Sequence, residues 1–332
     1  MSLLQISGLR VYFPVKGGVL NRTVASCRAV DGVSLTVGKG ETVGLIGESG
    51  CGKTTLGKTI VGLNKPVEGS IKFGGHEIAG CRPGMMSREM QMIFQDPAES
   101  LNPRMTVGAI LEEPFVIHKA CAPSERAHRV EALLQRVGLP ASAAGKFPFE
   151  FSGGQRQRIG IARALALQPQ LIVCDEPVSA LDVSVQSQVL NLMLDLQREF
   201  GMSYLFISHN LAVVRHISDR IAIMYLGKIV ELGPSSVITT APLHAYTKTL
   251  LSAIPKPDPS IKPQRSLPAG DVPSPINPPP GCAFGHRMKA PRYQESIGRE
   301  IGLREAAPGH WVSDCPCCVD QGLAGRDSLA AA

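Results

Sequence analysis

The chain has 332 residues, of which 44% are hydrophobic and 19% charged, so it is long enough for one large domain or two modest ones. The net charge of +6 is mild and the basic residues are scattered, so composition does not require a nucleic-acid partner. The sequence has no apolar run of the roughly 18–20 residues that a membrane helix needs and no opening secretory signal. We therefore expect a cytosolic chain that only other subunits hold at a membrane. The nine cysteines are scattered except near the end, which argues against a disulfide framework.

Two strands are expected before the first chemically informative motif. Residues 3–13 alternate well enough for a strand and end in two aromatics, and a second strand is expected near residues 28–37. In a purine-nucleotide site, an aromatic ring at the end of the first strand can stack on the base. Phe13 is the first candidate for this role and Tyr12 the second, although either ring can equally well be a core residue.

A phosphate-binding loop follows at residues 47–54, which read G-x-x-x-x-G-K-[ST] between an apolar strand (41–46) and a predicted helix (55–62). The glycines let successive backbone N–H groups turn toward an anion, and the positive end of the helix points at the same place. Lys53 is expected to bind the β- and γ-phosphates and the Thr54 hydroxyl to bind Mg²⁺. The sequence therefore predicts a nucleoside triphosphate site built from Gly47, Glu48, Ser49, Gly50, Cys51, Gly52, Lys53, Thr54 and Thr55.

A glutamine and a helical layer come next. Residues 90–94 are predicted to form a short strand that ends on Gln95, whose amide can contact Mg²⁺ and the attacking water, although glutamine is also common in loops. From about 98 to 150 the pattern changes, and helices are predicted over 107–117 and 124–137. This segment is expected to be an inserted helical layer between two groups of strands.

Residues 151–158 then open a helix that is predicted over 159–167. A serine is a good N-cap, and the glycines behind it leave backbone N–H groups open to an anion. This second anion site suits the γ-phosphate side of a nucleotide that a partner holds. Its residues are Ser152, Gly153, Gly154 and Gln155.

Two adjacent acids end the next apolar run, residues 171–174. Asp175 can hold the water shell of Mg²⁺, and Glu176 can act as general base for the attacking water. An isolated Asp-Glu pair is usually a solvated turn, but the apolar residues before it favour a buried strand with acids at its carboxyl end. A further strand ends shortly before His209, which stands where it can touch a γ-phosphate. A lone histidine at such a place is more often without a role.

With these parts in this order, residues 1–255 resemble the ATP-binding cassette ATPases. The resemblance is carried by the phosphate loop, Gln95, the signature Ser152-Gly153-Gly154-Gln155, Asp175-Glu176, the loop Ser179–Asp182, and His209. The signature separates this family from other phosphate-loop ATPases. The chain is similar in more detail to the F-type ATPase subunits of bacterial dipeptide and oligopeptide importers, at residues 29–34, 47–57, 94–97, 100–104, 176–184 and 267–284.

The resemblance implies ATP and Mg²⁺ as ligands, with Thr54, Gln95 and Asp175 near the ion. Each ATP would lie between the phosphate loop of one subunit and the signature of the other, with Asp182 in the nucleotide-binding set. Glu176 would polarise water, while His209 and Gln95 sense or position the γ-phosphate.

The resemblance also implies partners. They are a second, D-type ATPase in a heterodimer, two membrane-spanning permeases, and a periplasmic solute-binding protein. The permeases would dock near residues 96–105, and the chain would lie peripherally on the cytoplasmic face of the bacterial inner membrane. No nucleic acid is expected as a partner.

Beyond residue 252 the chain is proline-rich, which predicts a linker or an extended segment. Cys282, Cys315, Cys317 and Cys318 follow, and four thiols in a short tail are compatible with zinc or an iron–sulfur cluster. Some members of the family hold a cluster here. This chain, however, has Met288 at the second cysteine position and Glu295 and Ser296 near the third, so Cys317 and Cys318 look extra. A metal site and a reduced, partly disordered tail are both open, and the mismatch favours the tail.

The expected fold is α/β, of the RecA-like P-loop NTPase type, with an ATP-binding cassette domain over residues 1–254. It should contain a helical subdomain at about 98–168 and an N-terminal antiparallel β subdomain, and a C-terminal extension should follow over 255–332. The expected function is ATP hydrolysis that drives import of dipeptides or oligopeptides. Nickel, a metallophore or a glycan is the alternative cargo, because binding protein and permeases select it. A soluble DNA-maintenance ATPase would also carry the signature, but it would bring a coiled coil, a second cassette or inserted zinc modules.

Overall fold

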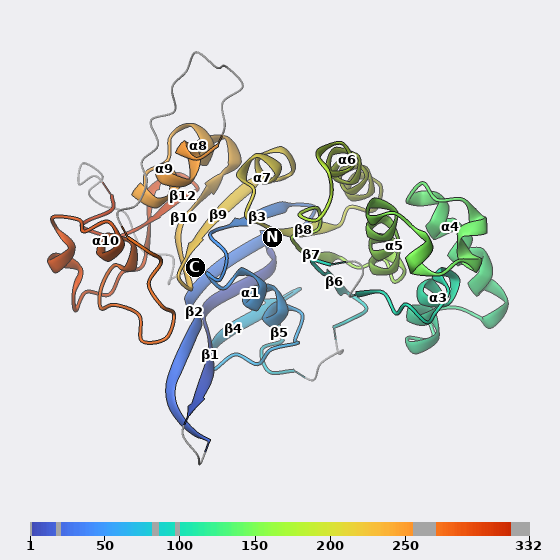
Figure 1. The fold of residues 1–332 in the computed structure, drawn as a ribbon, viewed down its shortest axis with the longest axis horizontal. Helices are drawn as coiled ribbons and strands as arrows, with labels where there is room; N and C mark the ends of the chain where they lie inside the picture. The colour runs from blue at the N-terminus through green and yellow to red at the C-terminus, as the bar shows by residue number, and fades with distance from the viewer. Residues whose placement is uncertain (1, 18–20, 82–85, 97–99, 255–269, 320–332) are drawn as a thin grey trace. The chain divides into compact units, whose positions relative to one another are not determined.

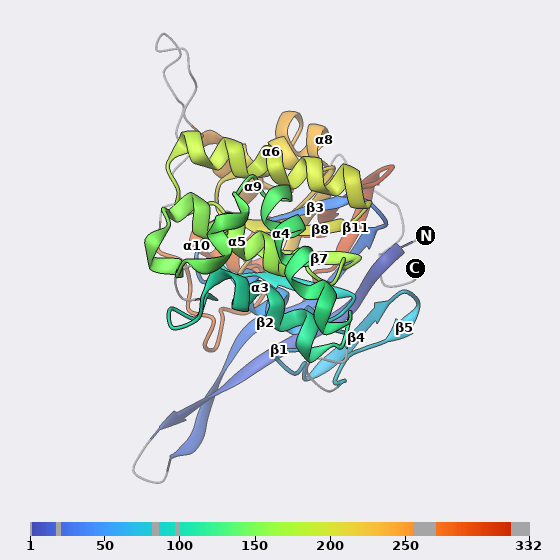
Figure 2. The same ribbon diagram turned by 90° about the vertical axis from the view of Figure 1, so that its right-hand side faces the viewer.

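The structure is a computed structural model that describes residues 2–17, 21–81, 86–96, 100–254 and 270–319 (Figures 1 and 2). Its contacts divide the chain into two compact units. The helical unit consists of residues 38–41 and 81–207, and the phosphate-loop unit of residues 2–37, 42–80 and 208 onward. The predicted domain boundaries at residues 98, 168 and 254 stay predictions.

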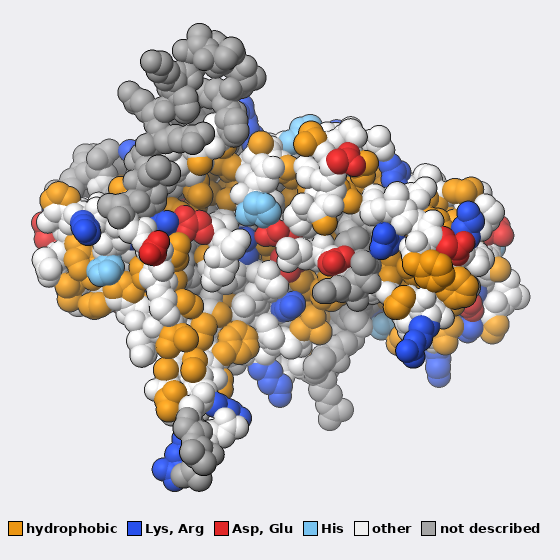
Figure 3. All heavy atoms as spheres, viewed as in Figure 1, with side chains coloured by type: hydrophobic (Ala, Val, Ile, Leu, Met, Phe, Trp, Pro, Cys, Tyr) orange, Lys and Arg blue, Asp and Glu red, His pale blue; other side chains and the backbone are white. Residues whose placement is uncertain are grey.

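The phosphate-loop unit contains an antiparallel sheet in the order β2-β1-β4-β5. Its strands are β1 (Ser2–Gly17), β2 (Arg22–Gly38), β4 (Glu68–Phe73) and β5 (His76–Glu77). Both ribbon views show β1 and β2 as a long twisted ribbon that extends beyond β4 and β5 (Figures 1 and 2). Hydrophobic side chains lie on part of this ribbon (Figure 3). Phe13 of β1 and Val24 of β2 are exposed. Because β1 ends at Gly17, the first strand continues past Tyr12 and Phe13, the aromatic pair at which we expected it to end.

Five further strands of this unit lie in the order β11-β12-β10-β9-β3. They are β3 (Thr42–Ile46), β9 (Arg220–Tyr225), β10 (Lys228–Pro234), β11 (Leu303–Ala307) and β12 (His310–Ser313). Strands β3 and β9 are parallel, and the other pairs are antiparallel. All five residues of β3 are buried, so the phosphate loop begins from a fixed strand end.

The helices of this unit are α1 (Lys53–Ile60), α7 (Leu211–Ile217), α8 (Ser235–Thr240), α9 (Ala245–Ser252) and α10 (Ala283–Arg287), with the 3₁₀ turn η4 (Tyr293–Ser296). Helix α7 packs closely on β3, because a Cβ on Gly44 would lie 2.1 Å from a methyl carbon of Val214. A glycine in this strand thus lets the helix approach the sheet.

The helical unit has three parallel strands in the order β8-β7-β6, namely β6 (Met90–Ile93), β7 (Leu171–Asp175) and β8 (Ser203–Ser208). Strands β7 and β8 are buried along their whole length, as expected of apolar runs in a parallel sheet. The helices are α3 (Val107–Ile117), α4 (Arg126–Arg136), α5 (Gly153–Leu165) and α6 (Val183–Phe200), with 3₁₀ turns η1 (Pro123–Glu125), η2 (Ala141–Gly145) and η3 (Pro148–Glu150).

Two expectations need correction. Helix α5 begins at Gly153, not at residue 159, because the Ser152 cap fixes the first turn and tolerates two glycines behind it. Residues 270–319 of the tail form α10, η4, β11 and β12, so for this part the expectation of a partly disordered segment is wrong. In the part of the chain that the structure describes, no helix is both long and apolar enough to cross a membrane.

Candidate nucleotide site and cysteine group

The phosphate loop has the strand–loop–helix setting that its motif requires. It follows β3 and leads into α1, whose N-cap Gly52 has a φ of 106°. A Cβ on Gly52 would lie 1.9 Å from the Ala29 carbonyl oxygen, and one on Gly47 would lie 2.1 Å from that of Met224. Neither position has room for a side chain, so packing requires glycine at both, and at Gly52 the positive φ favours glycine as well.

The Lys53 ammonium lies in the curve of this loop. Its Nζ donates to the Gly47 carbonyl at 2.7 Å and to the Glu48 carbonyl at 2.9 Å, and the residue is buried. A buried ammonium is stable only with such partners, and an anion in the loop would add the opposite charge. Burial raises the pKa of the neighbouring Cys51 thiol, as expected for a thiol with a structural role.

Two residues from later in the chain hold Glu48, which belongs to the phosphate loop. The Glu48 backbone N–H donates to the Tyr246 hydroxyl at 2.9 Å, and the Glu48 carboxylate is paired with Arg287 of α10. Sequence reasoning missed both contacts. Tyr246 and Arg287 lie in segments without a nucleotide motif, so in the sequence only their aromatic and basic side chains could have suggested such contacts.

The two aromatics of the first strand have different surroundings. The Tyr12 hydroxyl donates to Asp31 at 2.6 Å, and burial together with this bond raises the pKa of Tyr12 to about 12. The Phe13 ring is 41% exposed. Tyr12 is thus held by Asp31, whereas the Phe13 ring is exposed. Of the two candidates for base stacking, Phe13 is therefore the one with an exposed ring that is not tied to Asp31.

In the helical unit, the structure brings two predicted catalytic residues together. Gln95 follows β6, Glu176 follows β7, and the Gln95 amide donates to the Glu176 carboxylate at 3.4 Å. The Glu176 backbone has a φ of 47°, which is uncommon for a residue with a Cβ, and its N–H donates to the Ile207 carbonyl at 2.9 Å. Asp175, one residue earlier, is buried at the strand end. Strained backbone at a strand end is typical of functional sites.

The signature residues cap helix α5. The Ser152 hydroxyl accepts from the Gln155 N–H, and the Gln155 side chain accepts from the Ser152 N–H, so the two form a capping box. Ser152, Gly153 and Gln155 are exposed, as a site for a nucleotide on another subunit requires. A Cβ on Gly154 would lie 2.4 Å from a methyl of Val185 on α6, so this glycine lets the two helices pack.

Asp182 is the N-cap of α6 and accepts from the Val185 N–H at 3.0 Å. This bond and one from the Ser184 hydroxyl lower the pKa of Asp182. In the phosphate-loop unit, His209 is exposed and precedes α7. The predicted permease-docking segment 96–105 is described only in part, because residues 97–99 lie outside the described residues, as do 255–269 of the proline-rich segment.

The four tail cysteines come together in the phosphate-loop unit. The sulfur atoms of Cys282, Cys315, Cys317 and Cys318 all lie within 4.8 Å of one another. Cys317 and Cys318, which have no counterpart in the family's cysteine pattern, thus lie beside Cys282 and Cys315. Cys282 caps α10, and the other three follow β12, so only the tertiary fold makes them neighbours.

A phosphate loop after a parallel strand, paired acids at another strand end and a capped signature helix define an ATPase of the ATP-binding cassette class. Residues 30–179 match the family described as "ABC transporter", and residues 230–290 match the one described as "Oligopeptide/dipeptide transporter, C-terminal region". This chain belongs to the ABC transporter ATPases.

Curated relatives cover nearly the whole chain. It is 51% identical to the oligopeptide transport ATP-binding protein AppF of Bacillus subtilis, over 94% of this chain and 96% of AppF. It is 50% identical to the oligopeptide transport ATP-binding protein OppF of Escherichia coli, over 94% and 95%. Among solved structures, the dimeric post-hydrolysis state of the ATP-binding cassette MJ0796 bound to ADP and Pi is 27% identical and has a TM-score of 0.62. That match covers 70% of this chain and 98% of the other.

Proposed function

We propose that this chain is the ATP-hydrolysing subunit of an ABC importer for oligopeptides or dipeptides. The observation that carries the proposal is the presence, in one chain, of the nucleotide motifs and of the C-terminal region matched over residues 230–290. The relatives that are about 50% identical over nearly their whole length carry oligopeptide transport in their names. Nickel, a metallophore or another small solute remains the second candidate cargo, since ATPase subunits do not select it.

For the nucleotide, we propose that Lys53 binds the β- and γ-phosphates and that the backbone N–H groups of residues 47–55 surround them. Phe13 stacks on the base. Ser152, Gly153, Gly154, Gln155 and Asp182 act on the nucleotide that the partner subunit holds.

The proposed ion ligands fit Mg²⁺, because Thr54, Gln95 and Asp175 offer hydroxyl, amide and carboxylate oxygens. Mg²⁺, when bound with ATP, neutralises charge on the transferring phosphoryl group. Glu176 takes the proton of the attacking water, Gln95 orients that water, and His209 contacts the γ-phosphate. The Gln95–Glu176 hydrogen bond supports this assignment, because it holds the base and the orienting amide at one place.

Membrane-spanning permeases are the partners of an importer ATPase. We propose further that a D-type ATPase pairs with this chain, that a periplasmic solute-binding protein delivers the cargo, and that residues 96–105 receive the permeases. The chain then works at the cytoplasmic face of the inner membrane, and closure of the paired ATPases on ATP switches the permeases. The four tail cysteines are proposed to hold a metal centre in the C-terminal extension.

The experiment is a mild-detergent purification of the chain from its native membranes, with mass spectrometry of the associated proteins. Two multi-span permeases, a second ATPase and a solute-binding protein would support the proposal, and the ligand of the binding protein would identify the cargo. A chain that is recovered alone or with DNA would contradict the importer and leave only the ATPase.

A further inference from the structure

The four tail cysteines form one compact group of sulfur atoms. The Sγ–Sγ distances are 3.2 Å for Cys315–Cys317, 3.5 Å for Cys282–Cys318 and 3.8 Å for Cys317–Cys318. Cys282, Cys315 and Cys318 are buried, and Cys317 is partly buried. Among the described residues, the group contains four thiols and no nitrogen or oxygen ligand.

The spacing of the sulfurs decides how many metal ions fit between them. With a Zn–S bond of about 2.3 Å, two thiolates of one tetrahedral ion lie about 3.8 Å apart. These three observed distances run from 3.2 Å up to this value, and all four sulfurs lie within 4.8 Å of one another. In a [4Fe–4S] cluster each cysteine binds a different iron on the outside of a cube, so four sulfurs in mutual contact leave no room for it.

The backbone around the cysteines leaves space for one sulfur atom and donates a hydrogen bond to another. A Cβ on Gly285 would lie 2.3 Å from the Cys317 sulfur, so only a glycine on α10 leaves space for it. The Gly285 N–H donates to the Cys282 sulfur at 3.2 Å, a contact that stabilises a thiolate. The Cys282 N–H donates to Ser296, and the Cys318 carbonyl accepts from Ala245 at the start of α9.

We infer that Cys282, Cys315, Cys317 and Cys318 bind one zinc ion as a closed four-thiolate site, rather than the iron–sulfur cluster of some family members. Zinc is the usual ion of closed four-cysteine structural sites, and it binds such ligands more tightly than ferrous iron does. Four thiols lose four protons to solvent as four Zn–S bonds form, and no electron is transferred.

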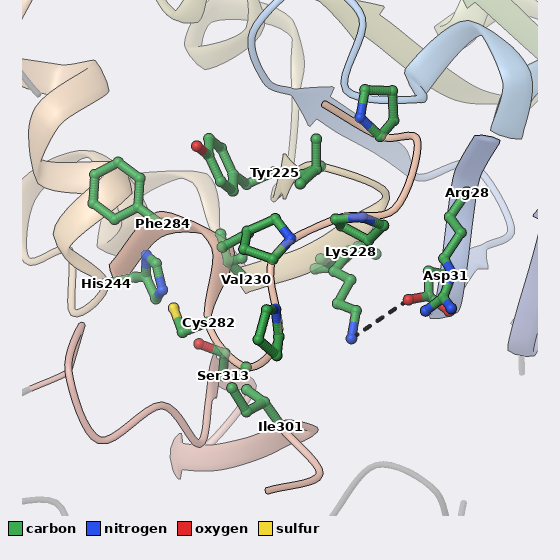
Figure 4. A pocket seen from close by; sticks show the side chains of 18 residues that line it. Arg28, Asp31, Tyr225, Lys228, Val230, His244, Cys282, Phe284, Ile301 and Ser313 are labelled. Atoms are coloured by element: carbon green, nitrogen blue, oxygen red, sulfur yellow. Dashed lines mark ion pairs between the residues drawn. The ribbon is translucent and has the colours of Figure 1, made fainter. Parts of the chain in front are cut away.

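A zinc ion bound here would fix the position of α10. Through Arg287 it would also fix the position of Glu48 in the phosphate loop. Cys282 is the N-cap of α10, and Arg287 is the last residue of this helix. Cys282 also lines a cavity of about 390 Å³ together with His244 and Phe284 (Figure 4). Zinc therefore joins the start of α10 to the segment after β12.

The test is the metal content of the full chain, purified under anaerobic conditions. We expect about one zinc per chain, no iron and no acid-labile sulfide. Cys317→Ser should lose most of the zinc, whereas Cys121→Ser, which changes a cysteine of the helical unit, should keep it.

Because a cysteine variant can fail to fold, the wild-type protein is also exchanged with cobalt. Tetrahedral thiolate coordination predicts strong visible absorption of the cobalt form, which excess zinc removes. Iron with sulfide, a single iron, or four metal-free thiols or disulfides would each overturn the inference. The inference rests on the proposed metal centre and names its ion. Its readouts need no ATP turnover, so a failed importer assignment would leave them unchanged.

Discussion

The Arg287 guanidinium lies 2.9 Å from both carboxylate oxygens of Glu48, although 239 residues separate the two in the chain. The side chains are 11% and 29% exposed, so the ion pair is only partly screened by water. The same guanidinium donates from Nε to the Gly270 carbonyl at 2.8 Å. The C-terminal extension thus holds a residue of the phosphate loop.

We predict that Arg287→Ala weakens ATP binding. Without its partner, Glu48 places an uncompensated negative charge beside the phosphates and the loop loses an anchor. The expected effect is about 1 kcal/mol, or roughly fivefold in the Kd for ATP. Titration with a fluorescent ATP analogue measures it.

The matched control is Arg299→Ala, which removes an exposed tail ion pair with Asp314 and leaves the phosphate loop alone. An unchanged Kd in Arg287→Ala would show that the ion pair does not affect the nucleotide site.

The glycines of the phosphate loop offer a second test. Both Gly50 and Gly52 have positive φ, but a Cβ on Gly50 meets no atom within 4 Å, whereas one on Gly52 meets the Ala29 carbonyl. Gly50→Ala should cost only the left-handed backbone, about 1 kcal/mol. Gly52→Ala should also displace the loop and lose most ATP affinity. Binding and melting temperature are measured together, and equal losses in the two variants would contradict the packing argument.

Glu176→Gln should keep ATP binding and lower the rate of hydrolysis about a hundredfold or more, because an amide cannot take the proton of water. ATPase activity is measured in the assembled transporter and nucleotide affinity in parallel. Glu131→Gln, an exposed position on α4, is the control. Near-normal hydrolysis in Glu176→Gln would remove this residue from the role of general base.

The surroundings of Glu231 on β10 predict that the stability of the folded protein depends on pH. It is fully buried and accepts hydrogen bonds from His310 Nε2 at 2.8 Å and from the Leu243 and His244 N–H groups at 2.8 and 3.1 Å. Burial raises the pKa of a carboxyl, but the bonds from His310 and the backbone outweigh it and lower the pKa of Glu231 below 4.5. A depressed carboxyl pKa stabilises the fold fully above pH 4.5, and this stabilisation is lost as the pH falls through the folded value.

We therefore expect Glu231→Gln to destabilise the protein by roughly 3 kcal/mol at neutral pH, with a difference from wild type that shrinks below about pH 4.5. Melting temperatures at a series of pH values measure this, with Glu300→Gln as an exposed control. A difference that stays constant down to low pH would exclude ionised Glu231 as its source.

The local structure around the phosphate loop could be predicted, because the motif is a continuous run whose conformation depends mainly on its own residues. The strand, glycine loop and helix at residues 41–62 are adjacent in the sequence, and their pattern is local. Helix α3 begins and ends at the predicted residues. The start of helix α5 was predicted six residues too late, because glycine disfavours helix in general and the Ser152 cap overrides this preference locally.

The tail could not be predicted in the same way. Its prolines and weak periodicity favour an extended segment, yet β12 pairs with β10 through Glu231 opposite Val312. Short strands with little intrinsic preference form because a neighbouring strand supplies their hydrogen bonds, and that neighbour is distant in sequence.

The sequence by itself determined the class of enzyme, the phosphate loop, the signature and the acids at a strand end, since these depend on residue type at fixed local spacing. Only the tertiary structure decided that Cys317 and Cys318 join Cys282 and Cys315, and that Arg287 meets Glu48. Both are contacts between segments that folding brings together, and no local spacing encodes them. The family's cysteine pattern has no counterpart of Cys317 and Cys318, whereas the positions of all four thiols in space make one metal-sized group.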